Sequence, residues 1–324
     1  MSFASRLAPA LVLAAAATVP ASAEHAPPLV AVVSQQAAQL TLVDPADGRR
    51  LGNVALDKAP AGIAVTPDGR TAFVTHPDLG RVSVVDLVGL KVTARFNIGE
   101  EPFGIALDSP TKGLLITDWS ANALVRVDPR TGTETGRAAI GRAPAGIVVN
   151  RENTRAYVAD RESDAVRIVD PRTMQRVGTL PTGRAPFALA LSPDETRLYV
   201  ANVRSNDLSV FALPEGREIA RPRVGLMPYG VTATGDGRHI AVTNQQGGRL
   251  AWLDAATNTL RTDGRIGAFP EGIIALSSGV ALTLWADDAL CIVDEPPETR
   301  CRITVPLPAG PRLLAKVPRP ATDK

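Results

Sequence analysis

The sequence is poor in the side chains that most often carry chemistry. Its 324 residues include two cysteines, three histidines and 4% aromatic residues. It contains no GxSxG, HExxH, CxxCH or GxxxxGK motif and no glycine-rich dinucleotide loop. Serine hydrolase elbows, covalent haem attachment and P-loop chemistry are therefore unsupported. The sequence favours a protein without catalytic activity, and we predict neither a cofactor nor a metal site.

A large excess of one charge is also lacking. The 35 basic and 33 acidic side chains leave a formal net charge of +2. Binding of single-stranded nucleic acid depends on basic surface interleaved with stacking aromatic rings, and an anionic membrane attracts strongly basic surfaces. The composition therefore favours neither nucleic acid nor a membrane surface as a partner.

Long apolar runs are confined to the amino end. Arg6 precedes an apolar run from Leu7 to Val19, and Ala-Ser-Ala follows at residues 21–23, which is the order of a cleavable secretory signal. The run is shorter than the ~20 residues that a membrane-spanning helix requires. We predict that residues 1–23 are a cleaved signal and that residues 24–324 form one domain without a membrane span. The mature protein is then periplasmic or secreted.

What the sequence does contain is a repeat of 42 residues. Six prolines mark it, most of them within a Pro-x-Gly-Ile or similar motif: Pro60, Pro102, Pro144, Pro186, Pro228 and Pro270. In the unit that begins at Pro60, we expect four strands, at residues 62–65, 72–75, 82–85 and 92–98, separated by turn-forming residues. A four-stranded unit without a helix cannot bury both faces of its sheet alone. Its neighbours must stack on it, and radial stacking gives a β-propeller.

The two ends of the repeat set the number of blades. Residues 30–34 supply a second strand without a first, and the segment from Pro311 supplies a first strand without a second. Pairing the carboxyl-terminal strand with the amino-terminal blade completes both and leaves no open sheet edge. The sequence therefore predicts an all-β, seven-bladed propeller of four-stranded antiparallel blades, with repeats from about residue 30 to residue 317.

Other recurrent positions have structural explanations. Trp252 falls on a third strand, so we expect it in the core. Aspartates end most third strands and are expected to accept hydrogen bonds in turns: Asp44, Asp86, Asp128, Asp170 and Asp254.

The last unit breaks the period, because Asp294 arrives two residues early. This unit contains both cysteines, Cys291 on the expected third strand and Cys301 on the expected fourth. With residues 295–298 as the turn, the two would lie opposite each other in one hairpin, where a disulfide can form. A redox-active pair is the alternative, but the CxxC spacing is missing. We predict a structural disulfide, which export to an oxidising compartment also favours.

The repeat resembles a known family. The pattern PAGIAVTPDGRTAFVTHPDLGRVSVVDL at residues 60–87, echoed by LYVANVRSNDLSVF at residues 198–211, is similar to the YVTN-repeat β-propellers. These are largely periplasmic or cell-surface proteins and include the YncE-like propellers. The resemblance implies the fold but not one function, because relatives include binding proteins, propeller subunits of quinone-cofactor amine dehydrogenases and accessory propellers of pyrroloquinoline-quinone systems. One YncE-like relative is also associated with single-stranded DNA.

A functional site in a propeller is expected where loops depart from the repeat around the central channel. Turns that follow second strands and turns that enter first strands share one face, called here the channel face. Its candidate site residues are His76, Glu101, Asp118, Trp119, Arg142, Arg161, Arg184, Arg204 and Trp285. The four arginines come from neighbouring blades, and their guanidinium groups could together bind a carboxylate or phosphate.

These residues favour a non-catalytic binding or scaffold protein. We expect a monomer whose channel face takes a periplasmic protein or a small anionic ligand. One alternative is an accessory subunit or partner of a quinone-dependent periplasmic dehydrogenase system. A second is a lactonase-like hydrolase, in which His76 would act as a general base with Asp118 or Glu101 around a bound cation.

Overall fold

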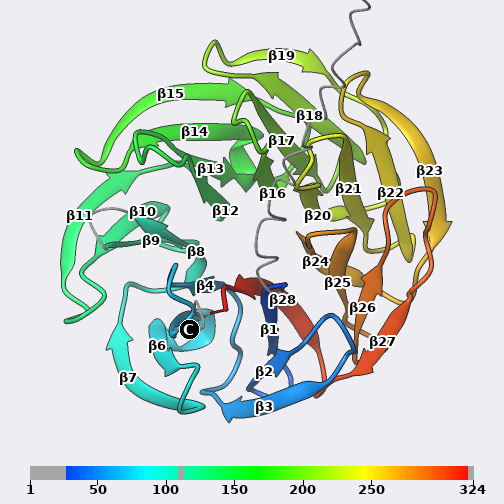
Figure 1. Cartoon of the computed structure of the whole chain (residues 1–324). Coiled ribbons are helices and arrows are strands. Elements are labelled where there is room, and N and C mark those ends of the chain that lie inside the picture. The colour runs from blue at the N-terminus through cyan, green and yellow to red at the C-terminus, as the bar shows by residue number, and fades with distance from the viewer. Residues whose placement is uncertain (1–26, 109–112, 320–324) are drawn as a thin grey trace, which may run out of the picture.

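The computed structural model describes residues 27–108 and 113–319, which form seven four-stranded antiparallel sheets around a central axis (Figure 1). The predicted seven-bladed propeller is confirmed. The predicted signal, residues 1–23, lies outside the described residues. Within the described residues, no helix is long and apolar enough to cross a membrane.

Each blade runs from an inner strand beside the axis to an outer strand at the rim. Blade 1 comprises β28 (Pro311–Val317), β1 (Leu29–Ser34), β2 (Gln39–Val43) and β3 (Arg50–Ala55). Blades 2 and 3 comprise β4 (Ile63–Val65), β5 (Thr71–His76), β6 (Arg81–Asp86) and β7 (Lys91–Asn97), then β8 (Pro102–Asp108), β9 (Gly113–Asp118), β10 (Ala123–Val127) and β11 (Glu134–Ala139).

The remaining blades repeat the same order. Blades 4 and 5 comprise β12 (Pro144–Val149), β13 (Ala156–Asp160), β14 (Ala165–Asp170) and β15 (Gln175–Pro181), then β16 (Pro186–Leu191), β17 (Arg197–Asn202), β18 (Asp207–Ala212) and β19 (Arg217–Ala220). Blades 6 and 7 comprise β20 (Pro228–Ala233), β21 (His239–Asn244), β22 (Arg249–Asp254) and β23 (Thr259–Arg265), then β24 (Pro270–Ala275), β25 (Val280–Leu284), β26 (Ala289–Val293) and β27 (Ile303–Pro306). Single-turn 3-10 helices follow two second strands: η1 (Pro77–Leu79) and η2 (Arg161–Ser163).

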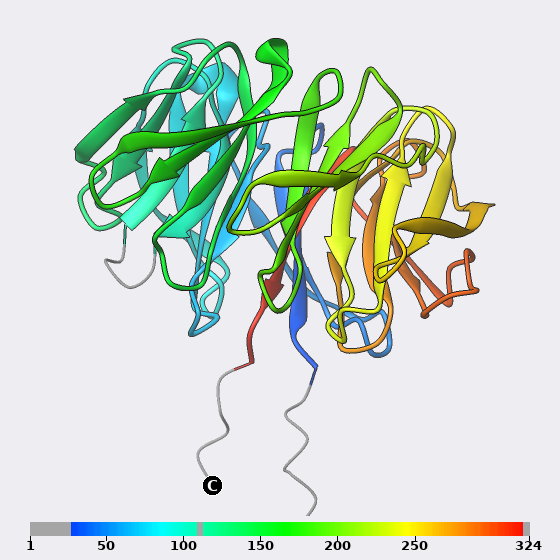
Figure 2. The ribbon, with the colours of Figure 1, turned by 90° about the horizontal axis from the view of Figure 1, so that it is seen from above.

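The ring closes as predicted, by pairing the last strand with the first. Strand β28 runs antiparallel to β1, from the pair Leu29 and Val317 to the pair Ser34 and Pro311. Beyond β28, Arg319 donates a 2.7 Å hydrogen bond to a carboxylate oxygen of Asp44. The start of β1 and the end of β28 therefore lie on the same face, opposite the channel face (Figure 2).

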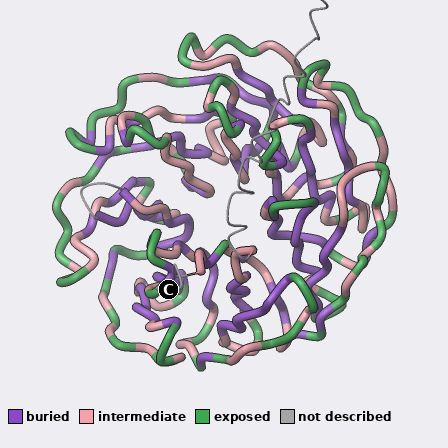
Figure 3. The backbone as a smooth tube through the Cα atoms, viewed as in Figure 1, coloured by how far each residue is buried: buried purple, intermediate pink, exposed green. Residues whose placement is uncertain are grey.

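Burial falls from the second and third strands of each blade to the rim (Figure 3). Every residue of β9 and β21 is buried, whereas residues of β7 alternate between exposed and half-buried. Neighbouring blades cover both faces of the inner part of each sheet. The sequences of its strands are therefore almost continuously apolar. Strand β7 at the rim is covered on one face and shows the period of two that a half-buried strand requires.

Threonine hydroxyls link adjacent blades near the axis. The hydroxyl of Thr117 on β9 accepts a 2.8 Å hydrogen bond from Gly104 N in its own blade and donates a 2.7 Å bond to Ala145 O in the next blade. A Cβ atom at Gly104 would stand 2.3 Å from Ala145 O, so only glycine permits this approach. Thr75, Thr243 and Thr283 make the same pair of bonds in their blades. These contacts explain why Pro-x-Gly and the threonine recur together.

The structural explanations given for Trp252 and the recurrent aspartates are confirmed. Trp252 is fully buried, and its indole N–H donates a 2.7 Å hydrogen bond to Glu298 O. The aspartates accept hydrogen bonds from backbone N–H groups two or three residues ahead: Asp44, Asp86, Asp128, Asp170 and Asp254.

The disulfide between Cys291 and Cys301 is present, with its Cα atoms 5.3 Å apart. Its predicted register is wrong. Cys291 on β26 pairs with Thr304 on β27, and Cys301 lies before β27 rather than on it. The connection between the strands spans residues 294–302 and is longer than the turn we assumed. The bond therefore ties this loop to β26 instead of joining two paired strand residues.

Candidate binding site on the channel face

Two sets of turns meet on the channel face, as the strand order requires. The turns that follow second strands bond to the segments that enter first strands. Trp119 N donates a 2.9 Å hydrogen bond to Glu101 O, and Gln245 N donates one of the same length to Met227 O. These bonds fix each channel-face turn to the start of its own blade, so the side chains there have a rigid base.

Three of the predicted arginines converge on one acidic residue, Glu162. Glu162, in η2, receives two hydrogen bonds from Arg204, at 2.8 and 3.0 Å, and pairs with Arg161 as well. The guanidinium of Arg142 donates to the backbone carbonyl of the same residue. The Arg204 hydrogen bonds, with the positive charges around them, hold the pKa of Glu162 below its ordinary value. Glu162 is therefore ionised and organises the arginines.

The fourth predicted arginine completes this group, defined here as the arginine cluster: Arg142, Arg161, Arg184 and Arg204. Arg184 accepts a backbone hydrogen bond from Arg204 N, and its own N–H donates to Ser205 Oγ, while its side chain is exposed. Arg204 also extends into solvent, with a side-chain exposure of 53%. Two of the four guanidinium groups pair with the single carboxylate of Glu162 and a third bonds its backbone carbonyl, so the cluster keeps an excess of positive charge.

Aromatic side chains lead from the arginine cluster into the channel. The guanidinium of Arg161 lies 5.5 Å from the ring centre of Trp119, a geometry in which a cation is attracted to the ring face. Trp119 contacts Phe103 edge to face at 5.5 Å, and Phe103 contacts Phe187 at 5.6 Å. Phe103 and Phe187 belong to blades 3 and 5, which are not neighbours. The rings therefore meet across the inner end of blade 4.

The channel is crossed by one arginine that sequence reasoning missed. Arg312, on β28 of blade 1, donates a 2.6 Å hydrogen bond to the hydroxyl of Tyr229 in blade 6, and its guanidinium lies 5.6 Å from the ring centre of Phe103 in blade 3. Its Nε is 3.3 Å from a carboxylate oxygen of Glu271, which is 6% exposed. Gln245 donates to the other oxygen of Glu271 at 2.6 Å. Burial raises the pKa of Glu271, against the opposing effect of Arg312.

A sequence signal for this crossing exists. Arg312, Tyr229, Phe103 and Glu271 each stand directly after the proline that begins a first strand. The seven residues at this position are Ala61, Phe103, Ala145, Phe187, Tyr229, Glu271 and Arg312. The residues around them keep the repeat, whereas this position changes from small to aromatic to charged. Variation at one fixed position within a regular repeat marks the residues that meet at the axis.

The other predicted site residues serve the fold or lie apart from the cluster. His76 is fully buried, with Nδ1 3.1 Å from Lys58 O and Nε2 2.9 Å from Ser83 Oγ. Burial lowers the pKa of His76, so the ring is neutral. Asp118 is 1% exposed and accepts hydrogen bonds from Glu100 N and Glu101 N at 2.8 and 3.0 Å.

Two further candidates, Glu101 and Trp285, are half-buried and lie outside the arginine cluster. The carboxylate of Glu101 accepts a hydrogen bond from the hydroxyl of Ser120. Trp285, in blade 7, packs edge to face on Phe269 with ring centres 6.2 Å apart. Phe269 is 47% exposed, so this pair forms an apolar rim away from the arginine cluster.

A family model decides the classification. The model for YncE-like β-propellers matches residues 111–277. The chain belongs to this family. The match spans the last three strands of blade 3, all of blades 4, 5 and 6 and the first strand of blade 7. It therefore includes the arginine cluster of this YncE-like propeller.

Solved structures show the same fold in proteins of different activities. Hydrazine synthase from Kuenenia stuttgartiensis is 19% identical with a TM-score of 0.71, over 78% of this YncE-like chain and 88% of that one. Dihydro-heme d1 dehydrogenase NirN is 17% identical with a TM-score of 0.65, over 86% and 63%. A candidate 6-phosphogluconolactonase from Bacteroides fragilis is 13% identical with a TM-score of 0.78, over 92% and 99%. No curated protein sequence matches significantly. At these identities the likeness is one of fold.

Proposed function

We propose that this YncE-like propeller is a non-catalytic binding protein that takes an anionic partner at the arginine cluster. The observation that carries the proposal is the convergence of three guanidinium groups on Glu162, with positive charge in excess. Guanidinium groups in fixed positions bind carboxylate and phosphate groups through paired hydrogen bonds. The partner is a small anionic ligand or an acidic segment of a protein.

Preorganisation supports this proposal. Arg204 is held by two hydrogen bonds to Glu162, and Arg161 is held between Glu162 and the face of Trp119. A partner that binds these side chains loses less conformational entropy than one that must order free arginines. The exposed side chains of Arg142 and Arg184 provide the remaining contacts.

The hydrolase alternative is not favoured. It assigns the role of general base to His76, which is fully buried with both ring nitrogens within 3.1 Å of partners in the fold. A general base must reach the proton that it removes. Asp118, its proposed companion, likewise accepts backbone hydrogen bonds.

An acidic peptide tests the proposal directly. We expect a peptide of alternating Asp and Glu to bind the wild type in calorimetric titration, and to bind more weakly in about 0.5 M salt because screening shortens the range of charge attraction. The double variant Arg142→Glu/Arg184→Glu should reduce affinity by about tenfold or more. Both substituted side chains are exposed, so the fold is retained.

A matched control separates the cluster from overall charge. Arg176 and Arg217 are exposed on the outer strands β15 and β19, away from the channel face. The variant Arg176→Glu/Arg217→Glu changes the net charge equally and should bind the peptide as the wild type does. Equal losses in both double variants would show nonspecific attraction, and no loss in the first would refute the cluster as the site.

We also propose that the protein works outside the cytoplasm. The disulfide and the family support an oxidising compartment. Mass spectrometry of the protein purified from its own cells should show an amino terminus at Glu24 and oxidised cysteines. A full-length reduced chain in the cytoplasmic fraction would contradict the proposal.

A further inference from the structure

A cavity lies on the face opposite the arginine cluster. It has a volume of about 990 Å³ and is lined by turns of blades 5, 6 and 7. Its walls include Asp236 and His239 of blade 6 and Glu295 of blade 7. The cavity is therefore independent of the proposed partner site.

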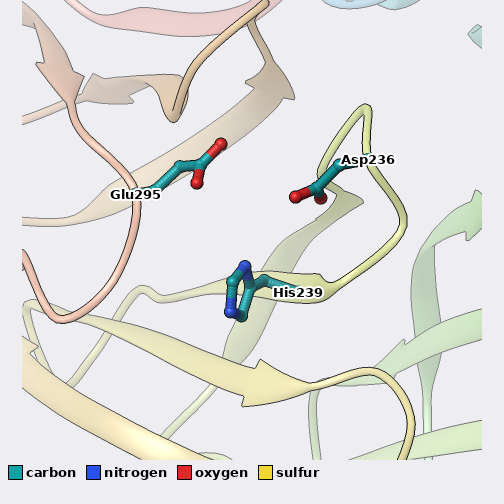
Figure 4. Close-up of side chains that lie close together, drawn as sticks. All are labelled: Asp236, His239 and Glu295. Carbon is teal, nitrogen blue, oxygen red and sulfur yellow. The ribbon is translucent and has the colours of Figure 1, made fainter. Parts of the chain in front are cut away.

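Three potential metal ligands meet in this cavity. Asp236 lies in the turn before β21, His239 is the first residue of β21, and Glu295 lies in the loop between β26 and β27. One donor atom from each lies within 4.8 Å of the others. Figure 4 shows one ring nitrogen of His239 turned toward the space between the two carboxylates.

The imidazole of His239 supplies an independent indication of a ligand. His239 is 8% exposed, and none of the described residues forms a hydrogen bond with its buried Nδ1. Its Nε2 lies 3.4 Å from NH1 of Arg261, which also pairs with Asp254 at 3.4 Å. A buried polar nitrogen without a partner costs about 1–3 kcal/mol. A guanidinium only donates, so Nε2 accepts from Arg261 here and the ring proton is on Nδ1. A metal ion on Nδ1 would remove that cost and move the proton to Nε2, while the half-exposed Arg261 turns from Nε2 toward Asp254.

Asp236 alone is an ordinary turn residue. Its Oδ1 accepts from Thr234 Oγ1 at 2.6 Å, and Asp194 accepts from Ser192 Oγ at 2.6 Å in the same turn of blade 5. What distinguishes blade 6 is the histidine that follows, since Arg197 holds the equivalent position in blade 5. Glu295 comes from the one unit in which the repeat slips. His239 and Glu295 therefore both depart from the repeat, and both line this cavity.

Arg238 neutralises the two carboxylates in this structure. Its guanidinium pairs with Asp236 and lies 3.6 Å from Glu295, while 70% of its side chain is exposed. A cation between the carboxylates would replace it, and its exposure allows it to turn into solvent. Arg238 thus competes with a metal ion for the same charges.

We propose that His239, Asp236 and Glu295 bind a divalent transition-metal ion of the Zn²⁺ class. One imidazole and two carboxylates suit Zn²⁺ among the common ions, and three protein ligands leave a coordination position open. That position faces the cavity, so water or a small anionic ligand completes the coordination. The sequence predicted no metal site because His239 falls on the face opposite His76, and a single channel-face histidine with scattered acidic residues makes no ligand cluster.

Titration with ZnCl₂ tests the site in chelator-treated protein. We expect one Zn²⁺ per chain in calorimetry, and an affinity reduced by about tenfold or more in His239→Gln and in Glu295→Gln. Co²⁺ in place of Zn²⁺ should give visible absorption bands that His239→Gln abolishes. Arg238→Gln should bind Zn²⁺ more tightly than the wild type, because the competing cation is removed.

Controls distinguish this site from adventitious binding. His25→Gln removes a histidine near the predicted mature amino terminus, and Asp194→Asn removes the equivalent turn carboxylate of blade 5. Both should bind Zn²⁺ as the wild type does. Glu295→Gln changes a loop residue that is one-third exposed, so its result holds even if His239→Gln unfolds. Zn²⁺ binding that persists in both His239→Gln and Glu295→Gln, or is lost in His25→Gln, would overturn the proposal.

Discussion

At the residue scale, the threonine hydroxyls near the axis hold neighbouring blades together. Thr117 satisfies Gly104 N and Ala145 O at once, and all three groups are buried. An apolar replacement of the same shape would leave an amide N–H and a carbonyl without this partner. Unpaired buried polar groups are more costly than lost surface contacts.

We expect Thr117→Val to lower the free energy of unfolding by about 2 kcal/mol. Thr117→Ser keeps the hydroxyl and should lose much less. Chemical denaturation of the two variants and the wild type measures the difference. Equal losses in Val and Ser variants would assign the effect to packing of the threonine methyl group instead of the hydrogen bonds.

His76 makes the stability of the protein sensitive to mild acid. Burial lowers its pKa below the ordinary value of 6.5, so the unfolded chain binds a proton at a higher pH than the folded chain does. Stability is then complete above about pH 6.5 and is lost as the pH falls through the lowered pKa. The melting temperature should fall between about pH 7 and pH 5, and His76→Gln should reduce this dependence. An unchanged pH profile in His76→Gln would contradict the assignment.

At the scale of elements, the disulfide ties the loop at residues 294–302 to β26. The cysteines are separated by 10 residues, and the chain-entropy model gives about 3 kcal/mol for a loop of this size. We expect Cys291→Ser/Cys301→Ser to unfold at lower denaturant concentration, with a loss of about 2–3 kcal/mol. A reducing agent should shift the wild type toward the variant and leave the variant unchanged. A variant as stable as the wild type would show that the loop is held by its other contacts.

Strand positions were predictable from the sequence because the repeat imposes them. The four strands expected after Pro60 match β4 to β7 within a residue or two. The register at the cysteines was not predictable, because the slip in the last unit allows more than one loop length. The arginines around Glu162 were foreseen from their blades. Glu162 was missed, because its role depends on side-chain contacts between turns that the repeat pattern does not predict.

At the scale of the whole molecule, ring closure depends on both ends of the chain. Strand β28 covers the edge of β1 along its full length, and Arg319 adds an ion pair to Asp44. The number of blades was predictable because the amino-terminal repeat lacks a first strand and the carboxyl-terminal segment supplies one. The crossing of the channel by Arg312 was not, because it depends on side-chain reach across the axis.

We expect deletion of residues 311–324 to abolish cooperative folding. The deletion removes β28 and leaves β1 as an exposed edge that can pair with other molecules. Deletion of residues 320–324 alone leaves β28 intact and should preserve the melting transition. Light scattering and thermal unfolding of both truncations measure the outcome. A soluble, cooperatively folded 1–310 chain would show that six complete blades and an open one suffice.

Arg312 has a consequence for the order of events during synthesis. It lies on β28, the last strand of the propeller in sequence order, yet it contacts residues of blades 3, 6 and 7. Blades 2 to 7 can therefore form their inner strands before the axis is filled, but blade 1 and the axis cannot be completed until β28 has emerged from the ribosome. A chain that stops before β28 would lack both the strand that closes the ring and the side chain that crosses the channel.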